Sequence, residues 1–221
     1  MNDKKIYYGA TILFVLNACY IAIRNMSQGN IMQGILGPVS LLFLLICPLA
    51  QMILRVRLGY IMRAFIILFS LAAFQLGTAL EWYDKFPNYS FLVHGISGIL
   101  FTQIGFFIYY IVRGKQERDL KRDWLLAACF ALFFCMTVAV GWEIIEFFTY
   151  QLTGRDVQHT LDTGVYDTMM DLISCTVGSL FMFGNYLFYV KRDKKSLLVK
   201  IVEEFYVLND ISIADNFDIV I

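Results

Sequence analysis

Charge is what this sequence has least of. Charged side chains make up 16% of its 221 residues, against about a quarter in ordinary soluble domains. Hydrophobic residues make up 59%, and the mean hydropathy is +0.64. A soluble domain of this composition would have too little polar surface to cover itself. The composition excludes an ordinary soluble domain, a disordered chain and a nucleic-acid-binding protein, and it indicates a small polytopic membrane protein.

Histidine and recognisable catalytic motifs are also scarce. There are two histidines, and the sequence has neither a nucleophile motif nor the Arg, Lys and His set of a phosphatase. The cysteine count is odd, and the cysteines lack the spacing of a metal site. All of them lie inside apolar runs, where small packing residues are the favoured interpretation: Cys19, Cys47, Cys129, Cys135 and Cys175.

The charged residues fall in clusters that are separated by six long uncharged runs of 17 to 30 residues. A helix needs about 20 apolar residues to cross a bilayer. The runs are continuous and contain glycine and alanine, whereas barrel strands alternate apolar and polar residues. We therefore predict an all-α bundle of six transmembrane helices within residues 1–192. The predicted spans are about 6–24, 35–54, 60–80, 91–112, 124–149 and 168–190.

The basic residues predict the orientation of these spans. Six spans place 15 of the 18 Lys and Arg residues on one side, and leave only Arg24, Lys85 and Arg155 on the other. Because Lys and Arg concentrate in cytoplasmic loops, both termini are expected in the cytoplasm.

Residues 193–221 are predicted to be a cytoplasmic amphipathic tail. Leu198, Val202 and Phe205 have the spacing of one helix face. We expect this short helix to lie on the membrane surface or against a cytoplasmic partner.

Ionisable side chains gather near the outer ends of the later spans. Glu143 and Glu146 are three residues apart in the last two turns of the fifth span, and Asp167 and Asp171 are four apart at the start of the sixth. Each pair therefore shares one helix face. His94 lies one turn inside the fourth span. Ionisable groups inside spans are costly, so they are functional candidates.

Glu81 and Asp84 close the third span, so four helices are expected to surround one outer cavity. Clustered carboxylates repel one another unless some are protonated, a basic residue joins them, or a hard divalent cation such as magnesium, calcium or manganese binds. With His94, zinc or iron would also fit. The candidate catalytic residues are His94, Glu143, Glu146, Asp167 and Asp171, and the candidate metal ligands are Asp84, Glu143, Glu146, Asp167 and Asp171.

Three segments resemble the YjdF-type bacterial integral membrane proteins, which are distantly VanZ-like. They are Tyr83-Asp84-Lys85, Trp142-Glu143-Ile-Ile-Glu146, and Gly164-Val-Tyr-Asp167-Thr-Met-Met-Asp171-Leu followed by Gly178. The resemblance covers about residues 75–185. It implies a bundle of about six helices with a polar site in a bacterial cytoplasmic membrane, and no settled activity. The family has a histidine soon after the first Asp, where this sequence has Asn88.

Three functions remain open from the sequence. The first is a cation-dependent membrane enzyme that acts at the outer face on a lipid or envelope precursor. The second is a cation- or proton-coupled transporter, although transporter sites usually lie near the bilayer midplane. The third is a non-catalytic envelope accessory protein whose tail binds a partner inside the cell.

Overall fold

The computed structural model describes residues 3–113 and 123–215, with side chains as far as Asn209. Every long element in these ranges is a helix, and six helices are long and apolar enough to cross a membrane. The predicted fold class is therefore confirmed, whereas the cytoplasmic placement of the termini stays a prediction. The predicted basic loop residues 114–122 and tail residues 216–221 lie outside the described residues. The six candidate spans are Asp3–Ser27, Ile31–Leu54, Tyr60–Ala79, Tyr89–Arg113, Trp124–Thr153 and Tyr166–Arg192.

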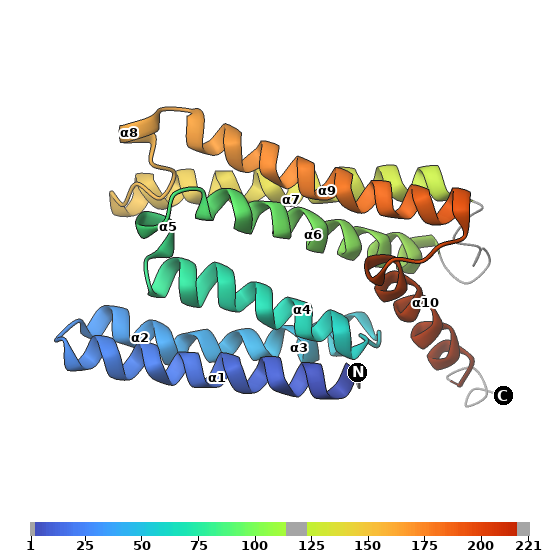
Figure 1. The fold of residues 1–221 in the computed structure, drawn as a ribbon, viewed down its shortest axis with the longest axis horizontal. Helices are drawn as coiled ribbons and strands as arrows, with labels where there is room; N and C mark the ends of the chain where they lie inside the picture. Colours follow the sequence, from blue (N-terminus) through green and yellow to red (C-terminus); the bar gives the residue numbers. More distant parts are fainter. Residues whose placement is uncertain (1–2, 114–122, 216–221) are drawn as a thin grey trace. The chain divides into compact units, whose positions relative to one another are not determined.

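The chain divides into two compact units, the first running to Tyr89 and resuming at Glu203, and the second comprising Ser90–Val202. The elements of the first unit are labelled in Figure 1 along the blue to green part of the chain. They are α1 (Asp3–Ser27), α2 (Ile31–Ser40), η1 (Leu41–Leu45), α3 (Ile46–Leu54), α4 (Tyr60–Ser70), η2 (Leu71–Ala79) and α5 (Trp82–Lys85).

The α-helix of the second apolar run is interrupted by a short 3-10 segment before Pro48. Proline has no N–H, so the carbonyl four residues earlier loses its helical partner. The backbone responds by tightening into the 3-10 segment η1 (Leu41–Leu45) before α3 begins. One candidate span is thus made of three consecutive helical segments.

The third span widens into a π-helix, η2, around Gln75. The Gln75 side chain is fully buried, so its amide needs partners inside the protein. Its Oε1 accepts a hydrogen bond from Asn17 Nδ2 (2.9 Å), and its Nε2 donates to Ser40 Oγ (2.7 Å). This network ties α1, α2 and η2 together.

The second unit is built on α6 (Tyr89–Arg113), α7 (Trp124–Thr153) and α9 (Tyr166–Arg192), with the short α8 (Thr160–Thr163) between the last two. In Figure 1 the three long helices lie side by side. Helices α6 and α9 approach so closely that a Cβ atom on Gly98 would overlap the Cys175 carbonyl, and one on Gly178 would overlap the Gly95 carbonyl. Small residues allow this kind of close packing in membranes.

The predicted tail forms α10 (Leu197–Asp215). Its expected apolar face is covered by the chain itself, since Val202 and Phe205 are buried. Within the first unit, Asn209 binds the backbone of Arg57 from both ends of its amide. Its Oδ1 accepts from Arg57 N (2.7 Å), and its Nδ2 donates to Arg57 O (2.9 Å). The tail helix is therefore docked on the connection before α4, while a cytoplasmic partner for it stays a prediction.

Glu204 lies on the same docked part of α10, and its carboxyl group packs against Gly59. A side chain at position 59 would overlap this carboxyl group. Burial raises the pKa of Glu204, and the negative charge of Asp3 raises it further.

Candidate functional site: a buried His, Glu and Asp group

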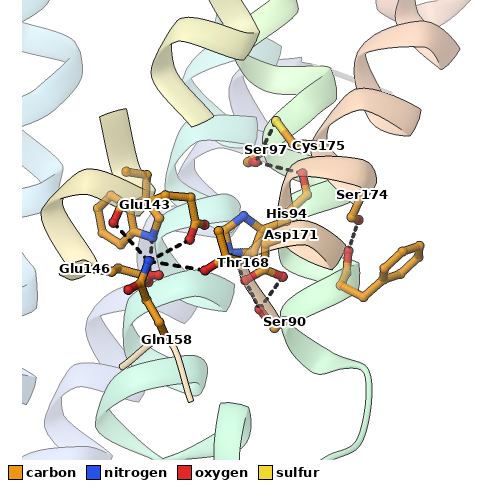
Figure 2. A network of polar contacts seen from close by, with 12 residues as sticks. Ser90, His94, Ser97, Glu143, Glu146, Gln158, Thr168, Asp171, Ser174 and Cys175 are labelled. Atoms are coloured by element: carbon orange, nitrogen blue, oxygen red, sulfur yellow. Dashed lines mark hydrogen bonds and ion pairs between the residues drawn. The ribbon is translucent and has the colours of Figure 1, made fainter. Parts of the chain in front are cut away.

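His94, Glu143 and Asp171 meet inside the second unit (Figure 2). They come from three different helices, α6, α7 and α9. One potential ligand atom from each lies within 4.8 Å of the other two. Glu143 is 7% exposed and Asp171 4% exposed, while the His94 side chain is 15% exposed. Three rigid elements thus hold one imidazole and two carboxyl groups together in a place largely closed to solvent.

The Asp171 carboxyl group is held by two residues of α6. His94 Nε2 lies 3.3 Å from Asp171 Oδ2. Ser90 Oγ lies 2.9 Å from Oδ1 and 3.0 Å from Oδ2, and donates its proton to this carboxyl group. Ser90 and His94 are four residues apart, so both face α9 from the same side of α6. Sequence reasoning missed Ser90, although this spacing could have indicated it.

Glu143 is held by Gln158, which lies in the connection between α7 and α9. Gln158 Nε2 is 3.1 Å from both the backbone oxygen and Oε2 of Glu143. It also donates to Thr168 Oγ1 at 3.3 Å. Gln158 is 7% exposed although it belongs to a polar loop. Nothing in the sequence distinguishes it from the other polar residues there.

Glu143 lies deeper along its helix than its predicted position in the last two turns. Helix α7 continues to Thr153 and ends at Gly154, whose φ of +72° is a left-handed conformation that favours glycine. The ten residues from Glu143 to Thr153 correspond to about 15 Å of helix. The prediction was wrong because the segment after Glu146 contains only aromatic, aliphatic and uncharged polar residues, none of which stops a helix.

Glu146 and Asp167, the other two candidate catalytic residues, lie outside this three-residue group. Glu146 Oε1 accepts a hydrogen bond from Trp142 Nε1 at 2.8 Å. Asp167 is partly exposed, one helical turn before Asp171. A catalytic or metal-binding role for these two acids stays a prediction.

Glu81 and Asp84 belong to the first unit. Glu81 pairs with Lys85 at 2.8 Å, and the hydrogen bond and charge of Lys85 lower the pKa of Glu81. Asp84, the remaining candidate metal ligand, is exposed on α5. That these acids share a cavity with the others stays a prediction.

Asp156, in the connection between α7 and α8, has a local structural role. It accepts hydrogen bonds from Leu161 N (2.8 Å) and Thr160 N (3.0 Å) at the start of α8. The Leu161 bond contributes most to a lowered pKa of Asp156. The ionised Asp156 carboxylate therefore satisfies the first backbone N–H groups of α8.

Residues 6–192 match the protein family described as "Predicted membrane protein (DUF2238)". The chain belongs to this family. Comparison with curated proteins gave no match, and neither did comparison with solved structures. The match supports an integral multi-pass membrane protein, and it does not extend to the YjdF-type or VanZ-like names.

In this DUF2238 protein the buried group has the chemistry of a cation site. Two buried carboxylates are costly unless a partner neutralises them. A divalent cation bound to neutral His94 and ionised Glu143 and Asp171 would make the group electrically neutral. Imidazole with carboxylates suits zinc, iron or manganese, and three protein ligands leave further positions for water or substrate.

Proposed function

We propose that this protein is a metal-dependent membrane enzyme that acts on a lipid or envelope precursor, with a divalent cation held by His94, Glu143 and Asp171. The observation that carries the proposal is the convergence of the three side chains, whose ligand atoms lie within 4.8 Å of one another. Carboxylates that merely mark helix ends would not be buried against a histidine from a third helix.

The surrounding residues support a preorganised site. Ser90 orients Asp171, and Gln158 orients Glu143. Such outer hydrogen bonds fix the direction of a ligand's lone pairs and tune its affinity. A bound divalent cation would supply an activated water molecule at neutral pH. Asp167, one turn from Asp171 on the same helix face, is the group we assign to accept the proton of that water.

Apolar residues near this end of the second unit support a lipid substrate. Phe148 on α7 is 56% exposed, Leu161 on α8 is 74% exposed, and Tyr166 at the start of α9 is 65% exposed. In a multi-pass membrane protein such side chains face the bilayer or its interface. A substrate with an acyl or prenyl chain could approach the site from the lipid.

The first test is a metal titration of the detergent-purified protein, with thermal unfolding as the readout. Magnesium, calcium, manganese and zinc are added separately. At about a hundredfold excess over its dissociation constant, a cation that binds only the folded state stabilises it by about 2.7 kcal/mol. The stabilisation by magnesium, calcium or manganese should be lost in Glu143→Gln and in Asp171→Asn. Glu146→Gln is the matched control, because Glu146 lies on the same helix outside the group, and it should keep the stabilisation.

The second test addresses catalysis. The wild type and Asp171→Asn are reconstituted in vesicles of bacterial lipid extract with the cation that binds best, and the lipids are followed by mass spectrometry. We expect new products with the wild type alone. A cation that binds without any change in the lipids would refute the enzymatic part of the proposal, and no saturable binding of any of the four cations would refute all of it.

A further inference from the structure

Two cysteine side chains lie close together, one to two helical turns along α9 and α7 from the His94 group. Cys175 follows Asp171 by four residues on α9, and Cys135 precedes Glu143 by eight on α7. Their Sγ atoms are 3.5 Å apart. Both residues are buried, with 0% exposure for Cys135 and 1% for Cys175. Two of the same three helices, α7 and α9, therefore hold a pair of thiols close to the candidate cation site.

Two oxygen atoms of α6 lie beside this pair of sulfur atoms. The Gly98 carbonyl oxygen is 3.5 Å from Cys135 Sγ, and Ser97 Oγ is 3.8 Å from Cys175 Sγ. Figure 2 shows Ser97 and Cys175 facing each other across the α6–α9 contact. The Ser97 hydroxyl donates its proton to the His94 carbonyl at 2.7 Å, so its lone pairs are available to another partner.

These three separations lie within about 0.3 Å of those between neighbouring ligands of a tetrahedral cation. With metal–sulfur bonds of about 2.3 Å and metal–oxygen bonds of about 2.1 Å, tetrahedral angles place two sulfurs about 3.8 Å apart and a sulfur and an oxygen about 3.6 Å apart. The three observed separations are 3.5, 3.5 and 3.8 Å. Thiol hydrogen bonds have similar lengths, and the experiment below distinguishes the two arrangements.

We propose that Cys135 and Cys175, with the Ser97 hydroxyl and the Gly98 carbonyl, form a second metal site for a divalent thiophilic cation of the zinc class. Binding displaces the two thiol protons, so the cation and two thiolates form a neutral unit that suits a buried place between helices. Sulfur ligands select softer cations than carboxylates do. The close contact at Gly98 and Gly178 holds α6 and α9 at the separation that this site needs.

Thiolate-to-metal charge transfer provides the test, because carboxylates and imidazole do not produce it. The reduced, detergent-purified protein is titrated with cadmium and, separately, cobalt, and the ultraviolet and visible absorption is recorded. The starting protein is the triple variant Cys19→Ser, Cys47→Ser, Cys129→Ser, which keeps only the two cysteines in question. We expect a charge-transfer band that saturates at one cation per chain.

The band should vanish when Cys135→Ser or Cys175→Ser is added, and it should persist when Asp171→Asn is added. The last variant separates this site from the His94 site, so the two proposals can fail independently. The wild type offers a second measurement that does not depend on variants folding, because cadmium should give the same charge-transfer band in it. Absence of the band at saturating cadmium in both proteins would overturn the proposal.

Discussion

Replacing Asn209 by alanine should release the tail helix from the connection before α4. The Asn209 side chain is 1% exposed, exchanges two hydrogen bonds with the Arg57 backbone and donates one to Phe205 O (2.7 Å). The bond to Phe205 stays within α10, whereas the two bonds to Arg57 connect the tail to the segment before α4. At about 1 kcal/mol net for each, their loss should weaken docking by about 2 kcal/mol, which is about a 30-fold change in the opening equilibrium.

Hydrogen exchange measured by mass spectrometry would detect this change as about 30-fold faster exchange in peptides from α10. Asn185→Ala is the matched control. Asn185 also donates from Nδ2 to the carbonyl four residues earlier, Phe181 O at 2.9 Å, but it lies on α9, outside the tail helix. The control should leave α10 unchanged. If exchange in α10 of Asn209→Ala stayed within about threefold of the wild type, the bonds to Arg57 would not be what docks the tail.

Three further predictions concern the site, the tail and the helix contact. Ser90→Ala should weaken cation binding by about 10- to 100-fold in the thermal titration, because Asp171 loses its orienting donor; unchanged affinity would show that Ser90 has no such role. Burial raises the pKa of Glu204, so its contribution to tail docking is full at low pH and declines as the pH rises through that raised pKa; Glu204→Gln should remove the resulting pH dependence of tail docking, as measured by hydrogen exchange of α10. Gly178→Val should lower the thermal stability strongly, whereas Gly184→Val, at a position with nothing within 4 Å, should be nearly neutral, and equal effects would refute the close contact.

The six spans were predictable because the membrane imposes a strong constraint on composition. Backbone groups in lipid must be satisfied within a helix, so long uncharged runs and transmembrane helices coincide. The ends were less predictable. The uncharged runs place the end of the fifth span near residue 149, whereas α7 ends only at Gly154. This helix terminates at a residue in the left-handed conformation, and not where charged residues begin.

The residues that form the candidate site were predictable in part for the same reason. Glu143, Asp171 and His94 stood out because ionisable groups are rare inside apolar runs. Gln158 did not, because a glutamine in a polar loop is ordinary until the loop folds back on Glu143. The two cysteines were assigned to packing, since the 40 residues between them hide the 3.5 Å separation of their sulfur atoms.

The acids that looked equivalent in sequence differ in their partners. Glu81 is paired with Lys85 and Glu146 is bound by Trp142, so each has a local reason for its position. Glu143 and Asp171 instead converge from separate helices on the imidazole of His94. Folding therefore brings two carboxylates close together, and their repulsion destabilises the folded state unless a proton or a cation neutralises them. That cost is why the pair is the strongest candidate for a cation site, and why the carboxamide variants Glu143→Gln and Asp171→Asn, when no cation is added, should be at least as stable as the wild type.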